Sequence, residues 1–244
     1  MVDISQQTLP VKRTRPYTIQ LSATSPQRVT YDYASRLPAE TLLTLYQTVK
    51  NALPDQTCHI LQFASAYKGE GAHLIAFETA LASATQIGLR VLYIDTAHQA
   101  CSIRTALASK LETTLDVLLQ SGGKLEDALV GIENTHFVYT LLRSSQFKDC
   151  ALANLDYMDE LLTLLRGMYD LIIFPSPHML ADVLCASMTR LADGTLLVVQ
   201  AERTRAPVAR QLKEAVMQNG GKKIIGAILN KRRFYIPRWF YKCL

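Results

Sequence analysis

Residues 68–73 read Lys-Gly-Glu-Gly-Ala-His, and this stretch decides how the chain folds. It follows an apolar run at 59–64 and precedes a helical pattern that begins at Leu74. A glycine-rich turn between a strand and a helix is the context in which backbone N–H groups bind phosphate. The sequence therefore predicts a phosphate-binding loop made of Lys68, Gly69, Glu70, Gly71, Ala72 and His73.

Apolar runs alternate with helical patterns along the rest of the chain. The predicted strands are 59–64, 90–95, 136–141, 170–175, 195–200 and 223–230, and the predicted helices between them are 74–87, 101–120, 151–166, 180–190 and 205–219. Continuous Val, Ile and Leu runs are typical of strands that are buried on both faces of a parallel sheet. The predicted fold class is α/β, a doubly wound, mostly parallel sheet flanked by helices, with ligands at the carboxyl ends of the strands.

The chain divides into three parts. Residues 1–37 are polar and contain several prolines, which indicates a flexible or loosely docked arm. Residues 38–230 form the α/β domain, which opens with a helix from Pro38 to about Ala52. Residues 231–244 form a tail that interleaves basic and aromatic side chains and contains no acid.

Composition narrows the classes of protein. The formal net charge is +5, and because the basic residues of the tail account for it, no basic nucleic-acid-binding face is indicated. The five cysteines have no metal-ligand spacing. The first ten residues lack the pattern of a signal peptide, and no apolar segment reaches the roughly 18 residues of a membrane span. We expect a cytoplasmic protein, peripheral to the inner membrane.

Several motifs occur together. Residues 64–71 read Ala-Ser-Ala-Tyr-Lys-Gly-Glu-Gly, residues 88–95 read Gly-Leu-Arg-Val-Leu-Tyr-Ile-Asp, residues 169–177 read Tyr-Asp-Leu-Ile-Ile-Phe-Pro-Ser-Pro, and shorter motifs follow at 192–194, 204–205 and 226–230. In this order and spacing they resemble the bacterial tyrosine kinases of the CpsD/CapB type, a branch of the MinD/ParA-like P-loop NTPases. The resemblance runs from about Pro38 to the end of the chain.

This resemblance implies a protein of exopolysaccharide or capsule production and export. Members of the family use ATP with magnesium and phosphorylate tyrosines in their own C-terminal tail. Their partner is an inner-membrane chain-length-determinant protein, a Wzz-like polysaccharide co-polymerase, and they associate into homo-oligomers.

The departures from the family pattern lie at the nucleotide site. The resemblance implies Lys at position 72 and Ser or Thr at position 73, where this chain has Ala72 and His73. It also implies metal-organising carboxylates at the positions of Ala97 and Phe174, and only Asp95 is retained. Because these groups position phosphates and magnesium during phosphoryl transfer, we predict a catalytically impaired, pseudokinase-like protein that regulates or scaffolds export.

Alternatives remain open at this site. Lys68 is placed to reach the phosphates in place of the missing lysine, which would keep the chain an active tyrosine autokinase. Gly69 and Gly71 leave weak binding of ATP or ADP without magnesium as an option. Asp95 either polarises a water molecule or caps the segment after it. His73 and His98 flank the same cleft but have no fixed third ligand beside them, so we expect no metal site.

Two surfaces remain for partners. The family's first helix carries Glu-x-x-Arg-x-x-Arg, which drives self-association, whereas this chain has Glu40, Leu43 and Tyr46 there. That helix packs on its own domain or forms a different interface, with a second copy or with an active paralogue. The tail carries Tyr235, Trp239 and Tyr241. It packs on the sheet, contacts a membrane or membrane protein as a MinD-like positioning factor does, or is phosphorylated by another kinase.

Overall fold

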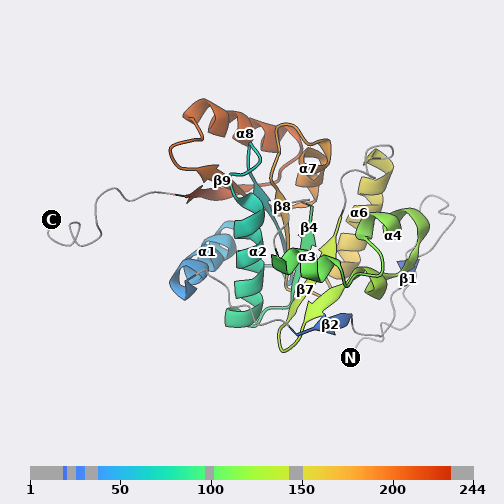
Figure 1. Cartoon of the computed structure of the whole chain (residues 1–244). Helices are drawn as coiled ribbons and strands as arrows, with labels where there is room; N and C mark the ends of the chain where they lie inside the picture. The colour runs from blue at the N-terminus through green and yellow to red at the C-terminus, as the bar shows by residue number, and fades with distance from the viewer. Residues whose placement is uncertain (1–18, 21–25, 31–37, 97–101, 143–150, 232–244) are drawn as a thin grey trace.

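The computed structural model describes residues 19–20, 26–30, 38–96, 102–142 and 151–231. Its centre is an eight-stranded sheet with the strand order β10-β9-β3-β8-β4-β7-β6-β2 (Figure 1). The strands are β2 (Gln27–Val29), β3 (His59–Ala64), β4 (Val91–Asp95), β6 (Val130–Ile132), β7 (Phe137–Leu141), β8 (Leu171–Ser176), β9 (Gly194–Gln200) and β10 (Ile224–Asn230). All neighbours pair in parallel except β6 and β7. Two short strands, β1 (Ile19–Gln20) and β5 (Gly123–Lys124), pair separately.

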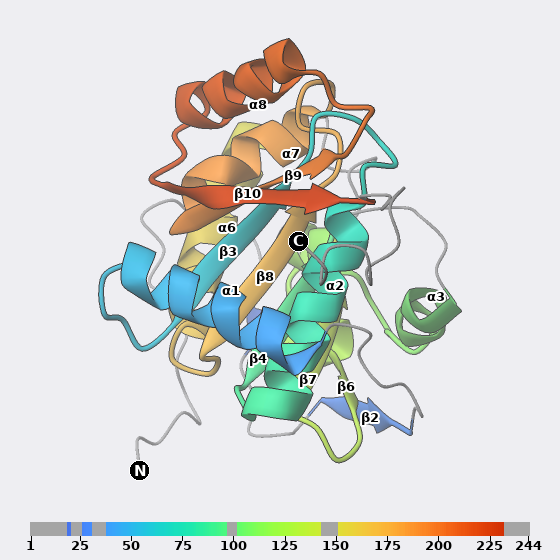
Figure 2. The same ribbon diagram turned by 90° about the vertical axis from the view of Figure 1, so that its left-hand side faces the viewer.

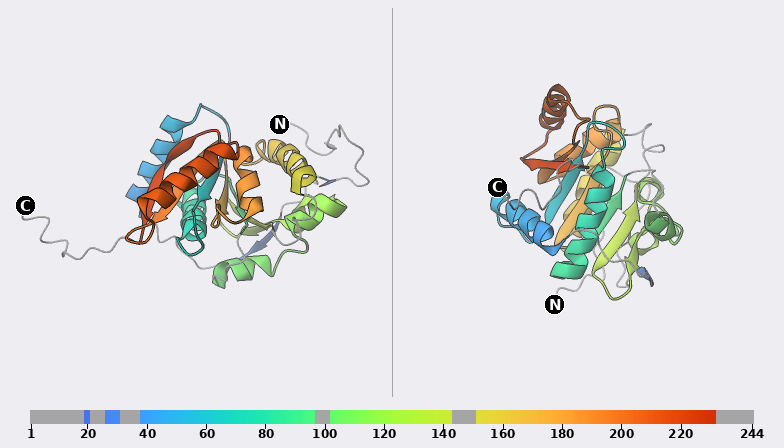
Figure 3. Two further views of the ribbon diagram at one scale, coloured as in Figure 1. Left: turned by 90° about the horizontal axis from the view of Figure 1, so that it is seen from above. Right: turned by 60° about the vertical axis from the view of Figure 1, so that its left-hand side comes forward.

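Helices cover both faces of this sheet. They are α1 (Ala39–Ala52), α2 (Ala72–Ala82), α3 (Ser102–Ala108), α4 (Leu115–Ser121), α6 (Ala151–Leu165), α7 (Val183–Ser187) and α8 (Ala206–Gln218). Short turns of helix follow α2 at Ser83–Ile87 and lie at Leu125–Ala128 and Met188–Leu191. Figure 3 shows α1 and α2 on one side of the sheet and α4 and α6 on the other, which is the doubly wound arrangement that the sequence predicts.

The two faces of the sheet have separate hydrophobic cores. On one face α6 contributes a stripe at three- and four-residue steps, with Leu155, Met158, Leu161, Leu162 and Leu165 all buried. On the other face α2 is buried along most of its length, because it lies on the sheet and α1 crosses over it beside β10 (Figure 2). The start of α2 is therefore fixed rigidly against the central strands.

The predicted strands match those of the main sheet closely, but shorter elements differ. The predicted helix 101–120 is two helices, α3 and α4, joined by residues 109–114, and the predicted helix 180–190 is α7 followed by a short 3₁₀ turn. Strands β1, β2, β5 and β6 were not predicted. Residues 27–29, within the stretch predicted to be a flexible or loosely docked arm, form β2 and pair with β6 at the sheet edge.

Candidate functional site

The predicted phosphate-binding loop lies between β3 and α2, at the carboxyl end of the sheet (Figure 1). Both of its glycines have positive φ, 93° at Gly69 and 101° at Gly71, a conformation that other residues adopt at a cost. Gly71 is also the N-cap of α2, and a Cβ atom there would lie 2.2 Å from Nδ2 of Asn230. The turn therefore requires glycine at position 71 on two counts, backbone conformation and space.

Glu70 anchors the loop from the inside. Its side chain is only 1% exposed, and Oε2 accepts a hydrogen bond from the backbone N–H of Tyr67 at 2.9 Å. Its other oxygen accepts a hydrogen bond from the hydroxyl of Thr204, which in turn accepts one from the backbone N–H of Gln200 at 2.9 Å. Glu70 therefore ties the loop to the end of β9, and its carboxylate is not directed at a ligand.

The end of β10 lies directly on the loop. Asn230 Nδ2 donates a hydrogen bond to the carbonyl of Glu70 at 2.8 Å. Lys231 Nζ donates to the carbonyl of Gly69 at 2.6 Å. These two bonds tie the loop to the end of β10.

The position of the family's catalytic lysine holds no charge. Ala72 is fully buried and its methyl group belongs to the core between α2 and the sheet. Lys68 is exposed at the loop surface. Its side chain could turn toward a phosphate bound at the loop.

His73 does not replace the missing cation. Burial, together with the positive charges of Arg104, Lys231 and Lys68, lowers the pKa of its imidazole to about 4. His73 is therefore neutral at pH 7. Its Nδ1 is buried and has no hydrogen-bond partner among the described residues.

Asp95 is held in a buried ion pair. Nη1 of Arg104 lies 3.3 Å from each of its carboxylate oxygens, and the hydroxyl of Tyr139 donates a hydrogen bond to Oδ2 at 3.0 Å. Asp95 is 2% exposed and Arg104 3% exposed. The sequence left water polarisation or capping open for Asp95, and the structure adds a third role, neutralisation by Arg104. Sequence reasoning missed Arg104, which lies on α3 and carries no motif.

Phe174 and its neighbours lie on opposite faces of the sheet. The side chain of Phe174 is fully buried in the core on the α6 side, whereas Ile173 packs in the core on the α2 side. Successive side chains of a strand point to opposite faces, so Pro175 follows on the α2 side. The metal position at Phe174 stays a prediction, and Pro175 is a second candidate for it, on the α2 side of the same strand end.

A proline fits at this central position because the ladder between β4 and β8 ends at the pair Tyr93 and Ile173. The carbonyl of Pro175 accepts a hydrogen bond from the hydroxyl of Thr96. The donor set beside the loop thus consists of a proline, an ion-paired carboxylate and a neutral histidine. These residues do not fit a magnesium ion. Proteins bind magnesium through carboxylate oxygens, and the carboxylate here is already paired with Arg104. Among the described residues, no group of three or more His, Cys, Asp and Glu side chains is placed to hold a metal.

The other predicted site residues fall into two groups. On α1, Glu40 is exposed, Leu43 is 52% exposed, and Tyr46 is half-buried with Nζ of Lys50 lying 5.7 Å from its ring centre. Ala97, Tyr235, Trp239 and Tyr241 lie outside the described residues. The ranges that are described contain no helix of the length and apolarity that crossing a membrane demands.

Comparison with known proteins agrees with this fold. No family model matches the chain. Curated relatives include the tyrosine-protein kinase YwqD of Bacillus subtilis, which is 26% identical over 197 residues (81% of this chain and 82% of that protein). The tyrosine-protein kinase CpsD of Streptococcus agalactiae is 27% identical over 173 residues (70% and 74%).

Solved structures show the same architecture. The kinase domain of the Escherichia coli tyrosine kinase ETK superposes with a TM-score of 0.67 at 22% identity and covers 90% of this chain and 94% of its own. A plasmid partition protein from Borrelia burgdorferi superposes with a TM-score of 0.60 at 16% identity, covering 77% and 86%. The fold is thus that of bacterial tyrosine kinase domains and of ParA-like P-loop ATPases.

Proposed function

Since the chain is a homologue of the bacterial tyrosine-protein kinases of the CpsD type, we propose that it keeps their fold but has lost phosphoryl transfer and acts by binding. The pathway we propose is the production and export of an exopolysaccharide. The role is that of a regulator or scaffold for the membrane protein that determines chain length.

The observation that carries the proposal is the buried ion pair between Arg104 and Asp95. Phosphoryl transfer depends on positive charge at the transferred group and on carboxylates that hold magnesium. Here the retained carboxylate is already neutralised by a buried guanidinium, and Ala72 supplies no charge in its place. Preorganised charge provides the largest share of catalysis in such sites, so we expect its loss to slow phosphoryl transfer by orders of magnitude.

Anion binding at the loop is a separate property that we propose is retained in weak form. The backbone N–H groups at the start of α2 remain, and Gly69 and Gly71 hold the turn open. ATP or ADP would bind without magnesium, because the metal-organising positions are filled by other contacts. The hydrogen bonds of Asn230 and Lys231 to the loop carbonyls support the conformation of the loop from within the protein.

One observation favours a second candidate, an active autokinase. Lys68 is exposed in the loop and lies near enough to His73 to influence its pKa. A lysine on this side of the turn would follow negative charge on a phosphate. It would not restore a metal site, which is why we rank this candidate second.

The partners follow from the homology. We propose that the chain is cytoplasmic, that it docks at the inner membrane on a Wzz-like polysaccharide co-polymerase, and that it associates with its own copies or with an active paralogue. The exposed Glu40 and Leu43 on α1, with the half-buried Tyr46 beside them, are the described residues that we assign to such an interface.

A kinase assay separates the two candidates. The purified chain is incubated with ATP, magnesium and the cytoplasmic segment of a Wzz-like co-polymerase from the same organism, and tyrosine phosphorylation is read with an anti-phosphotyrosine antibody. YwqD with its own activator is the positive control. We expect no signal above that of the Ala72→Glu variant, which repels phosphate. Autophosphorylation that depends on Lys68, shown by its loss in Lys68→Ala, would overturn the proposal and establish the second candidate.

A further inference from the structure

The strand β10 forms one end of the main sheet, and its outer edge has no neighbouring strand among the described residues (Figure 2). The carbonyl of Asn230 accepts a hydrogen bond from the N–H of Ala201, just past β9, so the backbone of Asn230 faces β9. Backbone groups alternate in direction along a strand, so those of Ala227 and Leu229 point away from β9. This open side, the β10 edge, therefore presents two N–H and two C=O groups to a further strand.

The β10 edge lacks the features that usually protect the last strand of a sheet. Exposed edge strands commonly carry charged residues, proline or a bulge, which prevent another chain from pairing with them. Residues 224–230 read Ile-Ile-Gly-Ala-Ile-Leu-Asn, with no charge and no proline. The irregular register lies at the start of the strand, between Ile224 and Gly226, and the rest is regular. Leu229 is 55% exposed on this regular part, which is suited to pairing.

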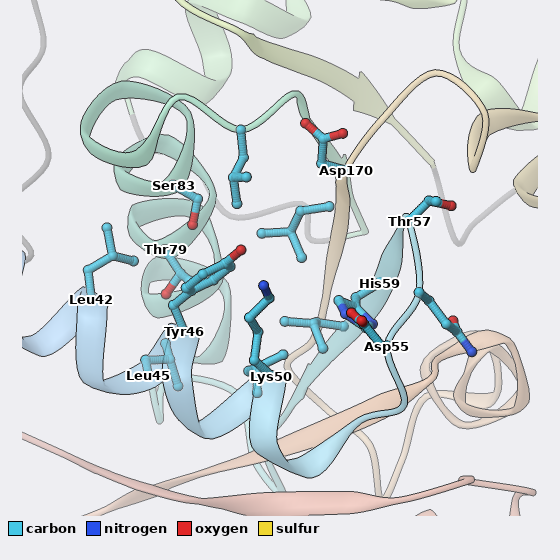
Figure 4. A pocket seen from close by; sticks show the side chains of 15 residues that line it. Leu42, Leu45, Tyr46, Lys50, Asp55, Thr57, His59, Thr79, Ser83 and Asp170 are labelled. Carbon is cyan, nitrogen blue, oxygen red and sulfur yellow. The ribbon is translucent and has the colours of Figure 1, made fainter.

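An open groove of about 470 Å³ lies between α1 and β10. The flank of α1 contributes Thr41, Thr44 and Thr48 to it, and β10 contributes Gly226 and Ile228. The groove is separate from the pocket of about 260 Å³ beneath α1, which lies on the flank of this helix toward α2 (Figure 4). The short threonine side chains and the glycine leave room for a side chain of an added strand.

The C-terminal tail is the segment of the chain that is joined directly to the β10 edge. Lys231, the residue after β10, has a positive φ of 55°, a conformation that occurs where a chain reverses. Residues 232–244 lie outside the described residues, and the chain ends there. Their length is enough for a returning strand after a four-residue loop over 230–233, a common loop length in hairpins. The tail is therefore long enough to cover the edge.

Pro237 determines which residues of such a strand face β10. Proline has no N–H to donate, so an edge strand tolerates it only where its backbone points away from the neighbouring strand. If Pro237 points outward, the alternation directs the backbones of Phe234 and Ile236 inward. A loop over 230–233 places Phe234 opposite Leu229, so that an inward-facing residue of the tail meets the open backbone groups of β10.

We propose that the tail folds back as an antiparallel strand on the β10 edge, with Leu229 opposite Phe234 and Ala227 opposite Ile236. Residues that stand opposite each other share a face of the sheet, so Phe234 covers the exposed side chain of Leu229. The tail also carries arginines and a proline, which protect an edge, so it supplies the outer strand that β10 is not suited to be.

The same pairing places Tyr235 in the groove. Tyr235 stands opposite Ile228, which packs with the core on the α2 side of the sheet and lines the groove beside α1. The hydroxyl of Tyr235 is therefore held against the domain while the tail is paired. A kinase reaches this tyrosine only after the tail has detached from the β10 edge.

Amide hydrogen exchange, followed residue by residue by NMR in the full chain, tests the pairing. The N–H groups of Ala227 and Leu229 exchange slowly only when the tail is bound, whereas those of Ile228 and Asn230 face β9 in either case. We expect removal of residues 232–244 to speed exchange at Ala227 and Leu229 by roughly tenfold or more and to leave Ile228 and Asn230 nearly unchanged. In the wild type we expect a nuclear Overhauser effect between the Hα atoms of Ile228 and Tyr235.

Two proline variants test the direction of the tail strand. Ile236→Pro places a proline where the backbone faces β10, and it should speed exchange at Ala227 and Leu229 as the truncation does. Pro237→Ala, at the outward position next to it, is the matched control and should preserve the protection. Thermal unfolding of each variant shows whether its domain is folded, and the wild-type measurements stand even if a variant fails to fold.

Three results would overturn the proposal. The first is fast exchange at Ala227 and Leu229 in the wild type, which would mean that the edge is open. The second is slow exchange that persists without the tail and is lost on dilution, which would assign the edge to a second copy of the chain. The third is full protection in Ile236→Pro, which would exclude the proposed pairing.

Discussion

The guanidinium of Arg104 lies 3.3 Å from both carboxylate oxygens of Asp95, and both side chains are almost completely buried. This pair stands at the carboxyl end of β4, beside the phosphate-binding loop. A carboxylate at that place is available to a metal only while it has no internal cation. The pair thus ties Asp95 to Arg104 and holds α3 on the sheet.

Removing one partner of the Arg104–Asp95 pair should destabilise the protein. Arg104→Met removes the cation and leaves the buried carboxylate without compensation, which should lower the free energy of unfolding by roughly 3–5 kcal/mol. The double change Arg104→Met with Asp95→Asn should recover part of this loss, because no buried charge remains. Urea unfolding of the wild type, both single variants and the double variant measures the coupling. Additive single effects would show that the two residues do not stabilise each other.

Restoring the missing charged and polar side chains tests why the chain is proposed to lack a magnesium site. Ala72→Lys, His73→Ser and Pro175→Asp together place a cation, a hydroxyl and a carboxylate on the loop side. We expect this triple variant to bind ATP more tightly in the presence of magnesium than in its absence, a difference that we predict the wild type lacks. Isothermal titration with and without magnesium measures both. A wild type that already gains affinity from magnesium would contradict the proposed loss of the metal site.

The matched control uses the neighbouring residue. Phe174→Asp in place of Pro175→Asp puts a carboxylate into the core on the α6 side, where Phe174 is fully buried. We expect that variant to lose several kcal/mol of stability and to gain no magnesium dependence, because an unpaired charge is buried in an apolar core. If Phe174→Asp instead restored magnesium-dependent binding, Phe174 and not Pro175 would be the metal position.

The lowered pKa of His73 makes the stability of the protein depend on pH. The pKa of His73 is about 4 in the folded protein and 6.5 when exposed, so the unfolded chain binds the extra proton between these values. Stability should therefore fall as pH drops from about 6.5 to 4, by up to about 2 kcal/mol, since partial exposure reduces the effect. Urea midpoints measured across this range should decline less in His73→Asn. His59, whose pKa is also lowered, contributes in the same sense in both proteins.

The buried hydroxyl of Thr79 on α2 leads to a prediction of a stabilising substitution. Oγ1 of Thr79 is buried without a hydrogen-bond partner among the described residues, so Thr79→Val removes an uncompensated polar group at nearly constant volume. We expect the free energy of unfolding to rise by about 1 kcal/mol. The exposed Thr163→Val should change it little. A destabilised Thr79→Val would mean that the hydroxyl has a partner in solution.

The sequence alone was sufficient to predict the central strands of the sheet and the loop between β3 and α2. Continuous apolar runs predicted β3, β4, β8, β9 and β10, and the glycines at 69 and 71 predicted the turn between β3 and α2. Strands β2 and β6, at one end of the sheet, were missed, because they have three residues each and β2 finds its partner β6 far along the chain.

Two features of the site were beyond sequence reasoning for physical reasons. The strand β8 is buried on both faces, so it has no apolar and polar alternation that would show which of Phe174 and Pro175 faces the α2 side. The partner of Asp95 is supplied by α3, nine residues further along the chain. No local rule links residues at this separation, and only the packing of α3 brings Arg104 to the strand end.

The last prediction concerns the glycine that closes the loop. Gly71→Ala forces a side chain into a backbone with φ of 101° and places Cβ 2.2 Å from Nδ2 of Asn230. The steric conflict can be relieved by Asn230→Ala, whereas the conformational strain, about 1 kcal/mol or more, cannot. We therefore expect Gly71→Ala to destabilise the chain more in the wild-type background than in the Asn230→Ala background. Urea unfolding of the four proteins measures the difference. Equal losses in both backgrounds would show that β10 moves away freely, and that its hydrogen bonds do not hold the loop.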